Sequence, residues 1–381
     1  MYTPGYSEAT ELVAALMRAA GLDVRQDSVG NLFGRWPGTD PDAPRVLTGS
    51  HFDTTLNAGK YDGVLGVLGA IDAVRRLQAR GVQPRRTIEI VGFAGEEPRF
   101  GAGCIGSRAM VGQLTREDLD TMRDREGISI AEAMRAVGLD PDRLREAVLD
   151  HENVHVLVEL HIEQGAVLEH DGITIGVVEH IAAPHDLRVT ITGSARHSGS
   201  TPMGLRRDAL TAASEVVLAV ERLASESRSG ATVGTVGVLD VRPGAVNVIP
   251  GQVRMDVDIR DSDLEARTEV VDATLAVLDE VASRRGLEYT VSTIARDVPA
   301  DCDPRIVEAV RDTCAELDLR FRGITSGAYH DAMVLGAKVP IGMIFVPSVN
   351  GLSHHPDEYT APEDLDRGVD VLSGTLARLA A

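Results

Sequence analysis

The organisation of the chain is clearest in the stretch VLTGSHFDTTLNAGKYDGVLG, residues 46–66. Its first six residues are largely apolar or small and predict a buried strand that ends at His51. The apolar spacing over 64–77 predicts the helix that follows, and 87–93 predicts a second buried strand, shortly before two adjacent glutamates. Open α/β sheets place their sites where strands give way to loops. The stretch therefore predicts an α/β domain with a site at its strand ends.

A second pattern occupies the middle of the chain. Short segments such as 187–192 and 253–257 alternate apolar and polar residues, which is typical of antiparallel strands with one solvated face. We therefore predict a catalytic mixed-sheet α/β domain made of residues 1–183 and 297–381. Residues 184–296 are predicted to form an inserted α+β domain, an antiparallel sheet plus helices, with hinges near its two ends.

Composition limits the classes of partner. With 381 residues, of which 43% are hydrophobic, the chain can bury two cores. The formal charge is −20 and only 3% of residues are aromatic, so we expect no nucleic-acid partner. Three separated cysteines, Cys104, Cys302 and Cys314, fit buried thiols in a reducing compartment. No leader segment or membrane span is evident, so we expect no membrane partner and a cytoplasmic location.

Imidazole and carboxylate side chains recur at the predicted strand ends and in glycine-rich loops. They are His51, Asp62, Glu97, His161 and His354. This donor set suits borderline divalent cations such as zinc, manganese, cobalt or nickel. Two such ions held close together could share one carboxylate and generate hydroxide from water at neutral pH. The sequence therefore predicts a two-metal hydrolase site with two divalent ions per subunit.

Two of these ligand assignments have alternatives. Asp62 precedes a predicted helix and could simply stabilise the N-terminus of that helix. Its closeness to His51 in the sequence favours a carboxylate that bridges two ions. His354 is followed directly by His355, and spacing alone allows either histidine to bind metal.

The adjacent carboxylates Glu96 and Glu97 are predicted to have different roles. A pair of neighbouring glutamates is most often only solvated. Here the pair follows an apolar strand in a chain with other ligands, so we assign Glu97 to metal binding and Glu96 as the general base. Asp53 lies two residues after His51 and is expected to accept the second N–H of that imidazole, which would fix its tautomer.

Other polar residues are candidates for substrate binding. Gln164, near His161, offers an uncharged hydrogen-bonding group. The inserted domain carries His197, Asn247 and Arg260 at predicted strand ends or turns. Arg260 could clamp a carboxylate through two hydrogen bonds, or could form a surface ion pair.

A glycine-containing loop, SGAYHD at residues 326–331, could also contact the substrate. Backbone N–H groups around Ala328 and Tyr329 are the candidate donors there. His330 in the same loop could equally be structural.

Together these segments resemble the M20 metallopeptidase clan, and within it the amidase group of N-carbamoyl-L-amino acid hydrolases, allantoate amidohydrolases and β-ureidopropionases. The segments that carry the resemblance stand in the family's order, at residues 49–54, 59–66, 96–107, 159–169, 197–208 and 353–358. The resemblance implies a catalytic domain of the metal-dependent exopeptidase type and the five ligands named above. It implies Asp62 as bridge, Glu96 as base and Asp53 behind His51, and it favours His354, since the family's ligand directly follows the serine.

The resemblance also implies a partner and a class of substrate. It implies a homodimer in which the inserted domain mediates dimerisation and acts as a lid. The substrate would be a small ureido or amide compound with a carboxylate. Gln164, His197, Asn247 and Arg260 would receive it, some of them from the partner subunit, and His197 is the best candidate for an oxyanion donor.

The implied reaction is cleavage of the carbamoyl C–N bond of an N-carbamoyl-L-amino acid or a related ureido acid. One alternative is a hydrolase of the same clan that acts on allantoate, an N-acyl amino acid or a dipeptide. Another class is a non-catalytic homologue that only binds such a ligand. The intact base Glu96 and the full ligand set argue against that class.

Two departures from the family pattern concern the pocket. The usual Glu-Glu-Gly-x-Arg-Phe is one residue shorter here, at Glu96–Phe100, and Tyr329 replaces the second glycine of Ser-Gly-Ala-Gly-His-Asp. A tyrosine fills space and adds a hydroxyl, so we expect altered substrate selection. The chain also begins later than most relatives, and we expect it to lack a first helix.

Overall fold

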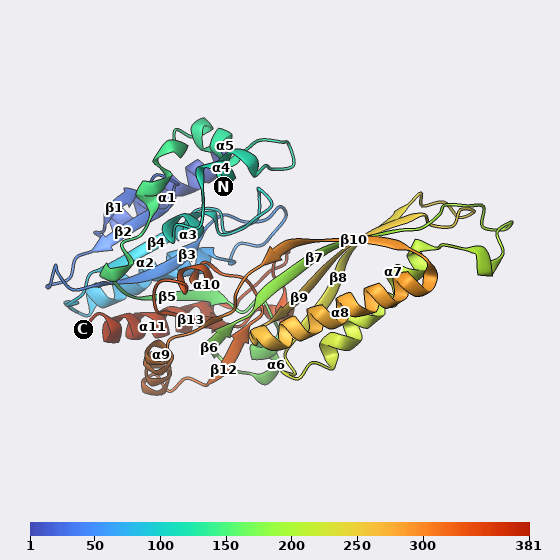
Figure 1. Ribbon diagram of the computed structural model, residues 1–381. Coiled ribbons are helices and arrows are strands. Elements are labelled where there is room, and N and C mark those ends of the chain that lie inside the picture. Colours follow the sequence, from blue (N-terminus) through green and yellow to red (C-terminus); the bar gives the residue numbers. More distant parts are fainter. The chain divides into compact units, whose positions relative to one another are not determined.

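Two sheets organise the chain, and each belongs to its own compact unit (Figure 1). The computed structural model describes all residues, 1–381. The first unit comprises Met1–His180 and Asp301–Ala381, and the inserted unit comprises Ile181–Ala300. The insertion predicted at 184–296 lies within the inserted unit.

A mixed nine-stranded sheet forms the centre of the first unit, in the order β1-β2-β4-β3-β5-β13-β6-β11, with β12 paired to β6. Its strands are β1 (Asp23–Gln26), β2 (Leu32–Trp36), β3 (Arg45–His51), β4 (Ile88–Phe93), β5 (Val154–Ile162), β6 (Ile175–Ile181), β11 (Ala300–Asp301), β12 (Phe321–Ser326) and β13 (Ile341–Val346). Strands β4 and β13 are buried throughout; β13 is a continuous apolar run, and β4 is apolar apart from Glu89. Strands β11, β12 and β13, from the C-terminal part of the chain, lie in this sheet.

Helices accompany the sheet of the first unit. They are α1 (Pro4–Ala19), α2 (Val64–Ala79), α3 (Ile105–Met110), α4 (Arg116–Thr121), α5 (Ile130–Ala136), α6 (Val167–Asp171), α9 (Pro304–Glu316), α10 (Asp331–Leu335), α11 (Pro362–Leu379), and the 3-10 helices η1 (Pro141–Ala147), η2 (His151–Asn153) and η4 (Val349–Gly351). Helix α11 packs against both α2 and α9. No helix of the chain combines the length and the apolar character needed to cross a bilayer.

The parallel strands of this sheet bring the candidate ligands to one edge. Strand β3 is parallel to both β4 and β5, and β13 is parallel to β5. His51 is the last residue of β3, His161 lies next to the end of β5, and Glu96 and Glu97 follow β4. The loop after β13 carries His354. Residues distant in sequence therefore meet at the carboxyl ends of the strands.

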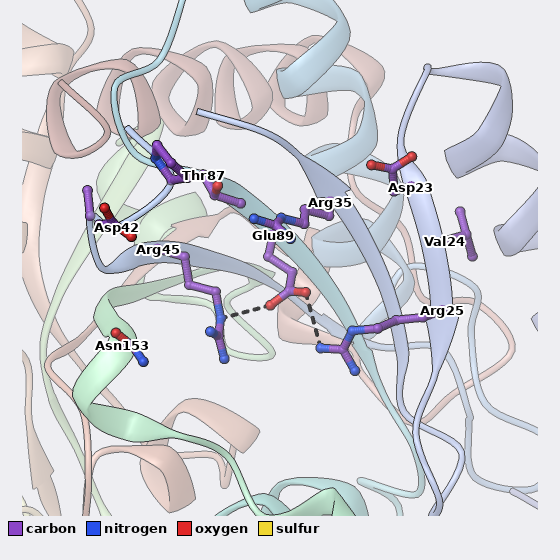
Figure 2. A pocket seen from close by; sticks show the side chains of 11 residues that line it. Asp23, Val24, Arg25, Arg35, Asp42, Arg45, Thr87, Glu89 and Asn153 are labelled. Atoms are coloured by element: carbon purple, nitrogen blue, oxygen red, sulfur yellow. Dashed lines mark hydrogen bonds and ion pairs between the residues drawn. The ribbon is translucent and has the colours of Figure 1, made fainter. Parts of the chain in front are cut away.

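The opposite, amino-terminal edge holds a polar cavity of about 560 Å³ (Figure 2). Figure 2 shows Arg25 of β1 and Arg45 of β3 on either side of Glu89 of β4, at distances of 3.1 and 2.9 Å from its two oxygens. Glu89 is buried, and the three arginines that line the cavity are matched by three carboxylates. With its charges balanced, this cluster ties three strands together.

The inserted unit is a four-stranded antiparallel sheet with two long helices. Its strands are β7 (Ala183–Thr192), β8 (Val233–Arg242), β9 (Gln252–Asp261) and β10 (Glu288–Arg296), and its helices are η3 (Met203–Leu205), α7 (Ala209–Ser225) and α8 (Leu264–Arg285). The order is β10-β7-β9-β8, all antiparallel. Alternate residues of β7 and β9 pack with the apolar faces of α7 and α8 in one core. The predicted antiparallel α+β character is confirmed.

Candidate metal centre

Asp62 lies at the centre of two groups of potential ligands. His51, Asp62 and His161 form one group, and Asp62, Glu97 and His354 form the other, with the ligand atoms in each group within 4.8 Å of one another. Oδ1 of Asp62 is 3.4 Å from Nε2 of His51 and 3.1 Å from Nε2 of His161. Oδ2 of Asp62 is 3.1 Å from Nε2 of His354. The two oxygens of one carboxylate thus face two different ligand sets, as a bridging carboxylate requires.

Backbone carbonyls orient the two buried imidazoles. Nδ1 of His51 lies 3.0 Å from the carbonyl oxygen of Asp53, and Nδ1 of His161 lies 2.9 Å from that of Ile162. A carbonyl only accepts, so Nδ1 carries the proton in both neutral rings and Nε2 lies on the side of Asp62; Nε2 of His161 also accepts the backbone N–H of Gly63 at 3.1 Å. Both histidines are therefore held in the tautomer that binds a cation through Nε2.

Asp53 has a different role from the predicted one. Its carboxylate is 3.7 Å from Nδ1 of His51, whereas its own backbone carbonyl takes that N–H at 3.0 Å. The carboxylate oxygens instead accept the backbone N–H groups of Glu96 and Glu97, each at 3.2 Å. The chain turns after β3, so the carbonyl reaches the ring first and the side chain extends to the loop after β4. Asp53 thus positions the loop that carries both glutamates.

The two glutamates occupy different surroundings. Oε1 of Glu97 is 3.6 Å from Nε2 of His354 and is buried without a hydrogen-bond partner. Oε2 of Glu96 is 3.8 Å from Nε2 of His51, and Glu96 belongs to neither ligand group. Burial raises the pKa of Glu96 well above 4.5; His51 opposes this shift, and Asp331 and other carboxylates reinforce it. This geometry favours Glu97 as a ligand and Glu96 as a proton acceptor next to the ligands.

The donor set fits divalent cations. Three imidazoles and several buried carboxylates converge here, and burial of so many charges is costly unless cations compensate them. Burial raises the pKa of Asp62, but its contacts with the imidazoles of His161, His354 and His51 outweigh burial and hold that pKa below 3.8. The unpaired Oε1 of Glu97 points to a missing partner.

Close backbone approach also shapes this centre. Gly63 has a φ of +65°, and a Cβ added there would lie 2.4 Å from the ring of His51. Only glycine allows the loop to pass so near the imidazole.

The neighbouring histidines His354 and His355 differ in their contacts. His354 reaches Asp62 and Glu97 as described, with a left-handed φ of 54°. Nδ1 of His355 instead accepts the backbone N–H of Asp357 at 3.1 Å, and the ring belongs to no ligand group. Spacing alone left both histidines open, and the geometry favours His354.

Gln164 contacts the ligands directly. Its Nε2 donates to Oδ2 of Asp62 at 3.0 Å and to the hydroxyl of Ser353 at 3.1 Å. Its Oε1 is buried without a hydrogen-bond partner. Gln164 therefore positions Asp62, and its Oε1 remains able to accept a hydrogen bond from another group.

The loop at residues 326–331 is held by internal contacts. The N–H of Ala328 donates to the hydroxyl of Ser326 at 3.2 Å, so it has a partner within the loop. The hydroxyl of Tyr329 accepts a hydrogen bond from Arg108, whose guanidinium also lies 5.7 Å from the centre of the tyrosine ring. His330 is buried 4.7 Å from the ring of His161, with Nε2 2.9 Å from Ser326 Oγ. His330 thus has structural partners.

The remaining candidates belong to the inserted unit. His197 and Asn247 lie on neighbouring segments: His197 bridges to Val248, and the carbonyl of Asn247 accepts the N–H of Ser198 at 2.9 Å. Nε of Arg260 is 2.9 Å from both carboxylate oxygens of Asp258, two residues earlier on the same face of β9. The surface ion pair considered for Arg260 is therefore present, with Asp258 as its partner.

Several residues that support the candidate ligands were not predicted from the sequence. Glu358 and Ser353 form hydrogen bonds around Asp62, although both lie in the segment 353–358 that carries the resemblance. Glu159 accepts hydrogen bonds from the hydroxyl of Ser50 at 2.6 Å and the N–H of Ala332 at 3.1 Å. The carboxylates of Glu358 and Glu159 are visible in the sequence as possible polar contacts. Their partners, however, lie on segments that are distant in sequence.

Comparison with known proteins gives consistent matches over the whole chain. Residues 42–378 match the family described as Peptidase family M20/M25/M40. N-carbamoyl-L-amino acid amidohydrolase of Geobacillus stearothermophilus is 44% identical over 380 residues, which cover 100% of this chain and 92% of that protein. Ureidoglycolate hydrolase of Arabidopsis thaliana is 42% identical over 387 residues, which cover 100% of this chain and 81% of that protein.

A solved structure also matches over the whole chain. The crystal structure of AtUAH in complex with (S)-hydroxyglycine has a TM-score of 0.88 and 42% sequence identity, and the match covers 100% of this chain and 92% of that one. The predicted resemblance and fold class are confirmed.

Proposed function

This chain belongs to Peptidase family M20/M25/M40, and on that premise we propose that it is a two-metal amidohydrolase of ureido acids. The proposed reaction cleaves the carbamoyl C–N bond of an N-carbamoyl-L-amino acid or a closely related ureido acid. One water is consumed, and ammonia, carbon dioxide and the amine are released. The observation that carries the proposal is the pair of ligand groups that share Asp62, with Glu96 beside them.

The similar proteins favour this class of substrate. Ureidoglycolate is, in chemical terms, an N-carbamoyl derivative of hydroxyglycine, so it carries the same ureido group next to a carboxylate as an N-carbamoyl amino acid. Hydroxyglycine, named with the AtUAH structure, is the amine that remains when the carbamoyl group is removed. One bond cleavage therefore accounts for the names of both relatives.

Five residues would hold the two cations: His51, Asp62, Glu97, His161 and His354. Bound divalent ions would lower the pKa of water and polarise the ureido carbonyl. Glu96 would take the proton from the attacking water and deliver it to the leaving nitrogen. Its raised pKa, caused mainly by burial, suits a group that both accepts and returns a proton.

Further proposals concern the substrate and the assembly. His197, Asn247 and Arg260 of the inserted unit would receive the carboxylate and the scissile group, with His197 as oxyanion donor. We also propose a cytoplasmic homodimer formed through the inserted unit. Support comes from β8, an edge strand that exposes Val233, Val238 and Leu239, since an apolar edge strand tends to pair with another chain.

A substrate panel tests the proposed reaction. The protein is loaded with zinc, manganese, cobalt or nickel and given N-carbamoyl-L-amino acids, ureidoglycolate, allantoate, N-acyl amino acids and dipeptides. Ammonia release from a carbamoyl amino acid or ureidoglycolate, but not from allantoate, is the expected result. Free acid from an acyl substrate would instead assign the chain to the acyl or peptide alternative. Binding of one ligand per subunit without any product would identify a non-catalytic homologue.

A further inference from the structure

Glu358 joins the two loops that carry Asp62 and His354. It is buried, with 3% of its surface exposed, and lies four residues after His354 in the loop that follows β13. Oε1 of Glu358 accepts the backbone N–H groups of Tyr61 at 2.9 Å and Asp62 at 3.2 Å. One carboxylate oxygen therefore holds the backbone of the central ligand.

The second oxygen of Glu358 reaches the same ligand from the other side. Oε2 is 3.0 Å from the hydroxyl of Ser353, and that hydroxyl is 3.1 Å from Oδ2 of Asp62. A hydroxyl has a single proton, so the two carboxylates share one donor. Ser353 directly precedes His354 in the chain. Glu358 thus restrains both the backbone of Asp62 and the residue next to His354.

Packing shows that the two loops are fitted to this side chain. A Cβ added to Gly59 would lie 2.3 Å from both Cβ and Oε1 of Glu358, so the loop backbone closes tightly over the carboxylate. The rings of Tyr61 and Tyr359 meet edge to face at 6.1 Å between the same loops. His354 itself has a left-handed φ of 54°, a conformation that persists only where its surroundings impose it.

From these contacts we infer that Glu358 is a positioning residue for one of the two cations, the ion that Asp62, Glu97 and His354 would hold. Its contact with the side chain of Asp62, made through Ser353, lies at Oδ2, which faces His354, whereas His51 and His161 face Oδ1. Loss of Glu358 would therefore weaken the binding of one ion and leave the binding of the other unchanged. This inference rests on the two-metal site of the proposed function.

The test is titration of metal-free protein with Zn²⁺, read by calorimetry, with the melting temperature of each metal-free variant measured alongside. The variants are Glu358→Ala and Glu358→Gln, and the matched control is Glu363→Gln, which removes an exposed carboxylate near the start of α11. Wild type and control should bind two ions. In Glu358→Ala one ion should bind about 10–100-fold more weakly, the usual effect of losing a group that orients a ligand, while the other ion keeps its affinity.

Glu358→Gln keeps the size of the side chain and one accepting oxygen, so it should fold and show a smaller loss at the same ion. Wild-type affinity for both ions in the two Glu358 variants, even with a lower melting temperature, would reduce Glu358 to a structural residue and overturn the inference. Equal weakening of both ions would also overturn it. Because the titration needs no substrate, wild type that binds two ions yet hydrolyses no ureido acid would refute only the proposed reaction.

Discussion

At the scale of residues, the site depends on small differences between neighbours. Glu96 and Glu97 are adjacent, and the backbone N–H group of each donates a hydrogen bond to the carboxylate of Asp53. Only Glu97 falls in a ligand group, and only its Oε1 is buried without a hydrogen bond. The different surroundings of Glu96 and Glu97 indicate different roles. Matched substitutions at the two positions should therefore separate metal binding from proton transfer.

Glu96→Gln should lower kcat about 10²–10⁴-fold, because the amide cannot accept the proton of the attacking water. Its zinc content should stay at two ions per chain. Glu97→Gln is the companion variant and should lose one ion. Elemental analysis together with ammonia-release kinetics checks both. Near wild-type turnover by Glu96→Gln would remove Glu96 from the role of base.

Tyr329→Gly should change substrate selection by restoring the small residue of the family pattern. We expect Tyr329 to line the substrate pocket, where its ring, held by Arg108, would fill space that a bulkier substrate side chain could take. We expect kcat/KM for a large N-carbamoyl amino acid to rise relative to N-carbamoylglycine by about tenfold, the scale of one or two methylene groups in a pocket. Tyr329→Phe, which keeps the ring, is the control. An unchanged ratio in Tyr329→Gly would place Tyr329 outside the pocket.

At the scale of elements, the sheet of the first unit has a functional edge and a structural edge. The carboxyl ends of the parallel strands carry the candidate ligands, and the amino ends carry the cluster of Arg25, Arg45 and Glu89. These two ends can therefore be perturbed separately.

Glu89→Gln should destabilise the fold without affecting zinc binding. It leaves Arg45, which is 23% exposed, without its carboxylate, whereas Arg25 is 52% exposed and can turn to water. We expect a loss of about 1–3 kcal/mol, less than for a fully buried pair. Urea unfolding measures it, and Arg35→Ala in the same cavity, with an exposed side chain, should stay within about 0.5 kcal/mol of wild type. A stability of Glu89→Gln equal to that of wild type would contradict the structural role.

The start of a helix can be predicted from the sequence where it depends only on neighbouring residues. Ser129 directly precedes the apolar run of α5 and caps that helix through a reciprocal pair of hydrogen bonds with Glu132. Pro141 begins the 3-10 helix η1.

Partners set by distant loops were not predictable in the same way. The carboxylate of Asp53 was expected to bind His51 and instead accepts hydrogen bonds from the loop after β4. The hydrogen bonds between Glu358 and the loop of Asp62 were not predicted. Residue types and their order indicate which side chains reach a site, but the contacts among them depend on how loops far apart in sequence meet.

At the scale of the whole molecule, the inserted unit should determine assembly. Its edge strand β8 exposes Leu239 with 45% of its surface accessible. Light scattering should give twice the chain mass of 40.6 kDa. Leu239→Glu should shift the protein towards that single-chain mass, whereas Leu12→Glu, an equally drastic change at an exposed position of α1, should not. A single-chain mass for wild type would refute the dimer.

The most direct measurement is a crystal structure of the protein grown with zinc, with the anomalous signal of zinc recorded. We predict two peaks about 3.5–4 Å apart, one on each side of Asp62, with His51 and His161 at one and Glu97 and His354 at the other. No peak at these side chains, or a single peak that Asp62 does not contact, would contradict it.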